Sequence, residues 1–366
     1  MSVQGADRVR MDSIEDAIAA IGRGDAIIAV DDEGRENEGD LIFAAEKATT
    51  EMTAFMIRYT SGYICVGMRA DDLDRLQLPP MTAVNEDRKG TSYAVSVDAR
   101  DVTSTGISAQ DRAITIRTLG SATTEPRDLT RPGHVMPLRA AVGGVLQRPG
   151  HTEAAVDLAN LAGLHPSGAL CEMVNDDGTM MDAAQCRRFA DEHGLLLVSI
   201  ADLIRYRLRF EKHVERVAET RLPTEHGDFT AIGFRSLLDG SEHAALVCGD
   251  LGDGEDLLVR VHVECLAGDA LRSVKCPCGA RLRESLRRVA DEGRGVVLYL
   301  RPGNDAGVLH RHDPAAAIHD PKSYGLGSQI LADLGVRSMR LLTGSPDRRY
   351  SVDGFGLEIS ETVPLS

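Results

Sequence analysis

Tryptophan is absent from the 366-residue sequence, and the aromatic content is only 4%. Aromatic rings on which bases could stack are therefore scarce, and a formal net charge of −15 repels nucleic acid. Long apolar runs are also missing, since no stretch approaches the ~18 residues of a membrane span. Residues 1–13 lack the apolar core of a signal peptide. We therefore expect a cytoplasmic protein that binds neither nucleic acid nor a membrane.

What the sequence does contain is typical of a globular protein. Apolar residues make up 43% and charged residues 27%, and 366 residues favour two domains, each with its own core. There are seven cysteines, an odd number, and three of them cluster as Cys265, Cys276 and Cys278. In a reducing compartment such a cluster favours a metal site over a disulfide.

Apolar spacing and capping residues predict alternating helices and strands, and hence a mixed α/β first half. A charged stretch, residues 205–224, lacks a strong apolar face and marks the domain boundary. We place a first domain at residues 1–207 and a second, α+β domain at residues 208–366. The predicted helices are 14–21, 50–59, 153–161, 183–193, 281–292 and 328–334; the predicted strands are 26–30, 195–200, 230–235, 244–248, 257–263, 296–300 and 338–343.

An acidic run, residues 31–40, directly follows the apolar strand at 26–30. It holds six carboxylates and one arginine, Arg35, between flexible positions at Gly34 and Gly39. A solvated charge run would explain six charges alone. At the end of a buried strand, however, such a loop is energetically costly because its like charges repel, unless a cation or a polyhydroxylated ligand binds there. The order of the sequence therefore favours a binding loop.

Three further clusters in the first half carry groups suited to catalysis. His134 follows a Pro-Gly turn, and a second such turn places Arg148, His151 and Thr152 at the start of a helix, where backbone N–H groups can bind phosphate. Glu172 lies in a largely apolar run, which would raise its pKa if it were buried. Each feature alone has an ordinary explanation as a turn or an edge strand. Together they fit metal-assisted proton abstraction beside the carbonyl of a small sugar phosphate.

Five segments of the first half, with their spacing intact from about residue 13 to residue 206, resemble the motifs of 3,4-dihydroxy-2-butanone 4-phosphate synthase. This family makes a four-carbon riboflavin precursor from ribulose 5-phosphate and releases formate, using magnesium or another divalent ion such as manganese. The resemblance also implies a homodimer with sites near its interface. The segments are DDEGRENEGDLIFAAE, TSTGISAQDR, RPGHVMPLRA, RPGHTEAAVDLANLAG and CEMVNDDGTM.

The resemblance assigns roles to individual positions. Glu36 and His151 would hold the magnesium ion, and His134 and Glu172 would carry the proton transfers. One departure is visible at Gly34, where the family usually has an acid. The positions that would contact the substrate are Arg35, Glu36, Asp40, Arg148, Gly150, His151, Thr152 and Glu172, with Thr105 as a weaker candidate for the phosphate.

The three cysteines of the second half offer three thiolate ligands, one fewer than a closed structural zinc site. Three protein ligands with an open fourth position is the arrangement of catalytic zinc, in which water becomes the nucleophile. Three reduced cysteines in a turn are the simpler alternative. The surrounding segments, RVHVECLAGD and CPCG, resemble GTP cyclohydrolase II, a domain that is often fused behind the synthase in bacteria.

Several active-site positions depart from the cyclohydrolase pattern. Where the family carries a glutamate and an arginine that contact GTP, this chain has Gly303 and Asp305. Asp320 matches the family. The family's arginine that is proposed as the nucleophile is replaced here by Lys322, which lacks the planar guanidinium group. About twenty residues before Asp320, including a catalytic tyrosine, are missing. A glutamine that contacts GTP is replaced by Arg281, and the family's Thr-Asn-Asn-Pro is residues 343–346, Thr-Gly-Ser-Pro.

We therefore expect a magnesium-dependent lyase whose second domain binds zinc and no longer turns over GTP. Two alternatives stay open. The second half could hydrolyse GTP or a modified purine, with Arg281 and Lys322 serving a different ligand, or it could be a zinc-stabilised module for binding or assembly.

Overall fold

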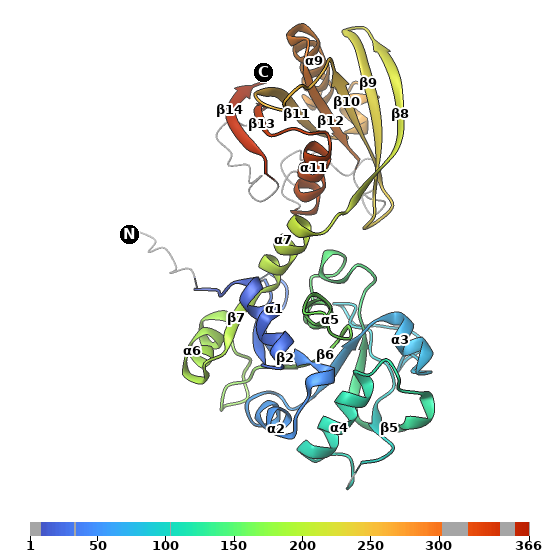
Figure 1. Ribbon diagram of the computed structural model, residues 1–366, viewed down its shortest axis with the longest axis vertical. Helices are drawn as coiled ribbons and strands as arrows, with labels where there is room; N and C mark the ends of the chain where they lie inside the picture. The colour runs from blue at the N-terminus through green and yellow to red at the C-terminus, as the bar shows by residue number, and fades with distance from the viewer. Residues whose placement is uncertain (1–8, 33, 103, 302–320, 345–355, 366) are drawn as a thin grey trace. The chain divides into compact units, whose positions relative to one another are not determined.

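In the computed structural model the chain forms two compact units, residues 1–206 and 207–366 (Figure 1). The structure describes residues 9–32, 34–102, 104–301, 321–344 and 356–365, without the side chains of residues 321–324. The division between the units falls inside one helix, α7 (Ile200–Phe210). Within the described ranges, no helix is both long and apolar enough to cross a membrane.

Each unit is built around one sheet with helices packed against it. The first unit contains α1 (Ile14–Arg23), β1 (Ile27–Val30), β2 (Gly39–Ala44), α2 (Thr50–Tyr59), β3 (Cys65–Met68), α3 (Ala70–Arg75), β4 (Val97–Ala99), α4 (Ala109–Leu119), β5 (Leu129–Arg139), α5 (His151–Leu161), β6 (Ser167–Glu172), α6 (Ala183–His193), β7 (Leu196–Ser199) and the start of α7. The second contains β8 (Val214–Thr224), β9 (Gly227–Ser236), β10 (Glu242–Cys248), β11 (Leu257–Val263), α8 (Leu266–Asp269), α9 (Cys278–Glu292), β12 (Gly295–Leu300), α11 (Pro321–Asp333), β13 (Ser338–Thr343) and β14 (Glu358–Pro364).

The sheet of the first unit has seven strands in the order β4-β5-β3-β6-β2-β1-β7. It is mixed: β1 pairs parallel with β7 and antiparallel with β2, and β2 pairs antiparallel with β6. The central strands are apolar and buried on both faces, as expected for a sheet covered by helices on two sides. One apolar core lies between the sheet and α2, α3, α4 and α6, and the other lies between the sheet and α1, α5 and α7.

Local sequence signals define the helices of this unit. The side chain of Ser13 accepts a hydrogen bond from Asp16 N at the start of α1, and Gly24 ends the helix at a φ of 94°. Asp182 and Gln185 form a reciprocal capping box at the start of α6. Helices α1 and α6 therefore begin where the sequence places capping residues.

The second sheet has the order β14-β13-β11-β12-β10-β9-β8. The pairs β8–β9, β9–β10 and β10–β12 are antiparallel, whereas the pairs β12–β11, β11–β13 and β13–β14 are parallel. Apolar residues of α11 pack into one core and those of α9 into the other, so helices cover both faces of this sheet as well.

The predicted mixed α/β fold with two domains is confirmed. The charged stretch at residues 205–224, for which the sequence predicted no helix or strand, forms the end of α7 and then the edge strand β8. Most side chains of β8 are exposed, so the strand has no apolar alternation for a sequence analysis to detect. Helix α5 begins at His151, two residues before the predicted start.

Candidate functional site: an acidic loop facing a helix N-terminus

The acidic loop between β1 and β2 is folded around one buried carboxylate, that of Asp31. Its Oδ1 accepts a hydrogen bond from Glu38 N at 3.0 Å and its Oδ2 accepts one from Glu36 N at 3.1 Å. Arg35 Nη1 donates to Asp31 Oδ2 at 2.9 Å and to Glu36 Oε2 at 2.6 Å. Asp31 therefore sets the shape of the loop, a role that the sequence analysis did not assign to it, although it is the first acid of the run.

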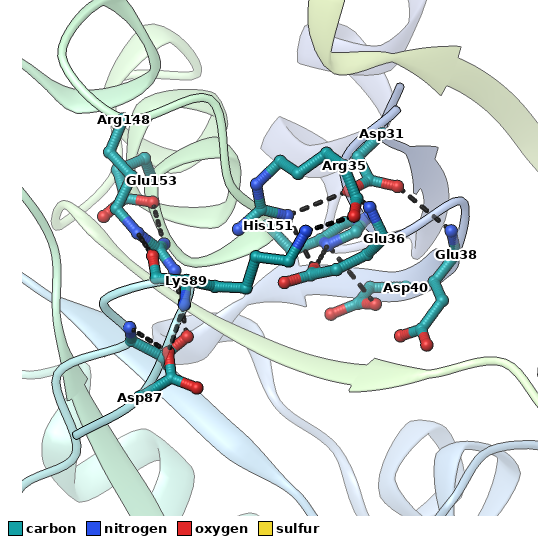
Figure 2. A network of polar contacts seen from close by, with 11 residues as sticks. Asp31, Arg35, Glu36, Glu38, Asp40, Asp87, Lys89, Arg148, His151 and Glu153 are labelled. Carbon is teal, nitrogen blue, oxygen red and sulfur yellow. Dashed lines mark hydrogen bonds and ion pairs between the residues drawn. The ribbon is translucent and has the colours of Figure 1, made fainter. Parts of the chain in front are cut away.

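Three acids and one histidine meet beside this loop (Figure 2). His151 Nδ1 lies 3.7 Å from Glu36 Oε2 and 3.7 Å from Asp40 Oδ1, which are ion-pair distances. Asp31, Glu36 and His151 each place a ligand atom within 4.8 Å of the others. The structure thus brings together Arg35, Glu36, Asp40 and His151, from two segments more than a hundred residues apart in the chain.

The surroundings of these groups move their pKa values in opposite directions. The interaction with His151 and the charge of Arg35 lower the pKa of Glu36 to about 2, although burial opposes this. Burial raises the pKa of Asp40 to about 7, and the charges of Glu172 and Glu38 add to the effect. Burial opposes protonation of His151, but Asp40 and Glu36 outweigh it and raise its pKa to about 9. The cluster therefore combines one strongly ionised carboxylate, that of Glu36, with a second, that of Asp40, whose ionisation burial disfavours.

Two features of the cluster fit a divalent cation. Asp40 Oδ1 and His151 Nε2 are both buried, and neither has a hydrogen-bond partner among the described residues. Carboxylate oxygens are the ligands that Mg²⁺ and Mn²⁺ prefer, and imidazole nitrogen is a common companion ligand. A cation bound between the carboxylates would give Asp40 Oδ1 a partner and would favour the ionised form of Asp40.

The N-terminus of α5 lies against the same loop. Its N-cap is Gly150, which provides no side-chain hydrogen bond to the first turn. A Cβ atom at this position would stand 3.0 Å from Arg35 Nη2, and Arg148 Nη1 is closer still, so glycine leaves room for two guanidinium groups. Thr152, in the first turn, is buried. Unpaired N–H groups at a helix N-terminus flanked by arginines are suited to binding a phosphate group.

Arg148 is also a structural residue. Its Nη1 donates to the buried Glu153 at 2.7 Å, its Nη2 donates to Thr91 Oγ1 at 2.9 Å and its Nε donates to Lys89 O at 3.2 Å. The Lys89 side chain in turn donates to Arg35 O (Figure 2). Arg148 thereby holds the loop at residues 85–91, and Lys89 connects that loop to the acidic loop.

Glu172 stands directly opposite Asp40, because the two residues are cross-strand partners of β6 and β2. Ser61 Oγ donates to Glu172 Oε2 at 2.7 Å, and the Ser61 N–H donates to Glu172 O at 2.8 Å. Glu172 is half-buried at the end of its strand, so it is less enclosed than the apolar run around it suggested. Its position places a carboxylate at the edge of the cation cluster.

His134 lies elsewhere in the unit, on β5, where Asp98 of β4 binds it. Thr105 is exposed in the bend next to Gly106, which contacts the same pair. No hydrogen bond or ion pair between described residues joins His134 to the Glu36 cluster. The residues predicted from the sequence therefore fall into two groups within the one chain.

The second unit contains the three-cysteine cluster. The Sγ atoms of Cys265, Cys276 and Cys278 lie within 4.8 Å of one another, and those of Cys265 and Cys276 are 3.7 Å apart. Burial and the two neighbouring sulfurs raise the pKa of Cys278 to about 12. Three thiols this close can all ionise only beside a cation, and three thiolates are the donor set that zinc prefers.

Several positions compared with the cyclohydrolase family cannot be placed. Gly303, Asp305 and Asp320 lie outside the described residues, as does the side chain of Lys322 in the first turn of α11. Arg281 is described, and it lies on the first half of α9. Its guanidinium group packs against Gly344, where a Cβ atom would stand 2.9 Å from Arg281 Nε.

Comparison with known proteins links each unit to one family. Residues 15–206 match the family 3,4-dihydroxy-2-butanone 4-phosphate synthase, and residues 215–364 match the family GTP cyclohydrolase II. The riboflavin biosynthesis protein RibBA of Nocardia farcinica is 57% identical over 97% of this chain and 91% of its own length. RibBA of Salinispora arenicola is also 57% identical, over 96% of this chain and 88% of its own length.

Solved structures agree with this assignment. RibBX of A. baumannii, described as a two-domain 3,4-dihydroxy-2-butanone 4-phosphate synthase, matches with a TM-score of 0.81 and 37% identity, over 97% of this chain and 100% of its own. A 3,4-dihydroxy-2-butanone 4-phosphate synthase in complex with two magnesium ions matches with a TM-score of 0.54 and 43% identity, over 55% of this chain and 99% of its own. The chain thus belongs to the RibBA family of riboflavin biosynthesis proteins, in which a 3,4-dihydroxy-2-butanone 4-phosphate synthase domain precedes a GTP cyclohydrolase II domain.

Proposed function

We propose that the first unit converts D-ribulose 5-phosphate to 3,4-dihydroxy-2-butanone 4-phosphate and formate with a divalent cation, magnesium or manganese. The observation that carries this proposal is the meeting of Glu36, Asp40 and His151 beside the uncapped N-terminus of α5. A cation cluster and a phosphate site side by side are what a small phosphorylated sugar requires.

Glu36 and His151 would hold the cation, which would polarise neighbouring carbonyl and hydroxyl oxygens of the sugar and so acidify the adjacent C–H bond. The magnesium-bound relative supports magnesium as the metal. Arg35, Gly150 and Thr152 surround the start of α5, where the substrate phosphate can accept hydrogen bonds from the first-turn N–H groups. Arg148 contributes positive charge there and keeps the neighbouring loop in place.

Proton transfers fall to Glu172 and His134. Glu172 is the cross-strand partner of Asp40 on the adjacent strand, next to the cation cluster. Its carboxylate can take a proton from the carbon skeleton of the bound sugar or return one to it. His134 has no contact with that cluster in its own protomer. We therefore propose a homodimer in which His134 of one protomer serves the acidic loop of the other, with Thr105 beside it.

The cation assignment is tested by Glu36→Gln and His151→Gln. Both variants should bind Mn²⁺ more weakly, by electron paramagnetic resonance titration, and should release formate from ribulose 5-phosphate at least ~10²-fold more slowly. Glu51→Gln, an exposed glutamate in the first turn of α2, is the matched control. Wild-type formate release by either site variant would refute the assignment.

We further propose that the second unit binds zinc but no longer hydrolyses GTP. The support comes from the substitutions at Gly303, Asp305 and Lys322, and from the packing of Arg281. At the positions of Arg281 and Gly344 the resemblance leads us to expect a glutamine and an asparagine, and here the guanidinium group occupies the space that a side chain at residue 344 would need. The larger side chain at residue 281 thus fills the space left by the missing side chain at residue 344, where the family's residues would contact GTP.

GTP consumption by zinc-loaded protein tests this second proposal, with ribulose 5-phosphate conversion as the internal positive control. We expect lyase activity without loss of GTP. Steady release of formate and pyrophosphate from GTP would show instead that the protein is fully bifunctional, as the RibBA name of its relatives suggests. Zinc content without nucleotide binding would favour the other alternative, a zinc-stabilised module for binding or assembly.

A further inference from the structure

The carboxylate of Asp98 holds His134 at two points. Asp98 Oδ2 lies 2.8 Å from His134 Nδ1, and Asp98 Oδ1 accepts a hydrogen bond from His134 N at 2.9 Å. Each carboxylate oxygen thus binds one nitrogen of the same residue, so both the backbone and the ring of His134 are fixed. The Asp98 side chain is 10% exposed, whereas that of His134 is 40% exposed.

Two glycines make this contact possible. Gly106 has a φ of 97°, and a Cβ atom there would stand 2.8 Å from His134 Nδ1 and closer still to Asp98 Oδ2. Gly133, directly before the histidine, leaves no room for a Cβ atom against the backbone of Val97. The tight packing on both sides leaves the Asp98 carboxylate and the imidazole ring little freedom to separate.

The chemistry of the pair fixes the tautomer of the histidine. An ionised carboxylate can only accept hydrogen bonds, so the proton of the neutral imidazole must lie on Nδ1. The lone pair then lies on Nε2, on the side of the ring away from Asp98, and the His134 side chain is partly exposed. A general base needs such a lone pair, and a buried carboxylate on the opposite nitrogen also stabilises the imidazolium once the proton is taken.

From this geometry we propose that Asp98 is a positioning residue for catalysis, which holds His134 in the Nδ1–H tautomer with Nε2 directed outward. The inference rests on the proposed role of His134 in proton transfer. Asp98 need not contact the substrate, and its effect is expected in the rate of turnover rather than in substrate binding.

Steady-state kinetics of the full chain separate a role of Asp98 in turnover from a role in substrate binding. Asp98→Asn puts an N–H donor within reach of Nδ1 and favours the wrong tautomer, so kcat should fall by about 10²–10⁴-fold while KM changes by less than about 3-fold. Asp101→Asn, the same change at an exposed position three residues along, should keep the wild-type kcat. Wild-type kcat in Asp98→Asn, with His134→Gln inactive, would overturn the inference alone. An active His134→Gln would overturn the proposed role of His134 and this inference with it.

Nitrogen-15 NMR of histidine-labelled protein reads the tautomer of the His134 ring directly, without relying on activity. The His134 signals, assigned by their loss in His134→Gln, should show a protonated Nδ1 and an unprotonated Nε2 at a pH at which the ring is neutral. In Asp98→Asn the protonated nitrogen should become Nε2. A wild-type ring protonated on Nε2 would overturn the proposal, as would an Asp98→Asn variant that loses activity with its tautomer unchanged.

Discussion

Carboxylates only a few residues apart in the acidic loop meet very different surroundings. Glu36 faces an arginine and a histidine, and its pKa falls to about 2, whereas Asp40 is fully enclosed at the start of β2 and its pKa rises to about 7. Burial and neighbouring acids also raise the pKa of Glu38. Position relative to the sheet, rather than residue type, therefore decides which acid is charged before a cation binds.

We predict that the metal-free protein becomes less stable as the pH rises from about 5 to about 9. The pKa of Asp40, about 7, exceeds its unfolded value of 3.8, so the folded state keeps a proton that the unfolded chain has released, and this contribution is lost as the pH passes 7. The pKa of His151, about 9, exceeds 6.5, so its contribution is lost as the pH passes 9. The two effects have the same sign, and each should lower the free energy of unfolding by about 1.4 kcal/mol per pH unit between the unfolded and the folded pKa of its group.

Thermal unfolding in the presence of a chelator, recorded across this pH range, measures the effect. Asp40→Asn should flatten the profile, whereas Asp71→Asn, an exposed aspartate of α3, should not. Added magnesium should stabilise the wild type most at high pH, where the carboxylate of Asp40 is ionised. A stability of the first unit that stayed constant or rose between pH 5 and 9 would contradict the prediction.

At the scale of single residues, the sequence indicates the candidate catalytic and binding side chains better than it indicates the residues that hydrogen-bond to them. The acidic run and the two Pro-Gly-His turns were predictable because their residue types and spacing are local features of the chain. Asp31, Ser61 and Asp98 were not assigned roles, although each binds a predicted site residue or its backbone. For Ser61 and Asp98 the partner lies more than thirty residues away, on a neighbouring element, and no local pattern records such a pair.

Among the elements, α7 and β8 are joined through one side chain of α11. Gln329 Nε2 donates to Leu208 O and to Glu211 O, each at 2.6 Å, and Gln329 Oε1 accepts from His213 N at 2.8 Å. The amide thereby satisfies carbonyl groups at the C-terminal end of α7, which no residue further along the helix can reach.

We predict that Gln329→Glu destabilises the second unit by about 2–3 kcal/mol. The substitution keeps the shape of the side chain, but a carboxylate cannot donate to the two carbonyl groups, which are left without their partner. Hydrogen exchange of the β8 amides and calorimetric unfolding of the full chain measure the loss. Gln110→Glu, on an exposed position of α4 in the first unit, serves as the control. Equal protection of β8 in both variants would show that Gln329 does not support this junction.

Elements with an apolar period were predictable, and those without one were not. Helices α2 and α6 and strands β11 and β13 have the predicted bounds, since each has an apolar face or a continuous apolar run that only one structure buries. Strand β8 pairs with β9 along its whole length, yet it buries little of its own surface. What holds β8 in the sheet is backbone pairing, which leaves no trace in the order of side chains.

At the scale of the whole molecule, each unit has its own sheet, its own apolar cores and its own cluster of side chains of the types that ligate metals. The carboxylate and histidine cluster belongs to the first unit, and the three cysteines belong to the second. Hard oxygen ligands favour magnesium or manganese, whereas soft sulfur ligands favour zinc. The two clusters therefore differ both in their position in the chain and in the ions that their ligand types would favour.

This separation predicts that the two metals can be removed independently. A zinc-selective chelator, applied in excess magnesium, should leave formate release from ribulose 5-phosphate within about 2-fold of its starting rate, because no cysteine of the cluster belongs to the first unit. The same treatment should lower the unfolding temperature of the second unit, since an ion present at about a thousand times its dissociation constant stabilises the folded state by about 4 kcal/mol.

Removing magnesium should have the opposite pattern, abolishing formate release while leaving the unfolding transition of the second unit unchanged. Cys276→Ser should reproduce the effect of the zinc chelator, and Cys248→Ser, at a buried cysteine outside the cluster, controls for the loss of a thiol. Loss of lyase activity on zinc removal alone would mean that the second unit supports catalysis in the first, and that the two sites are coupled.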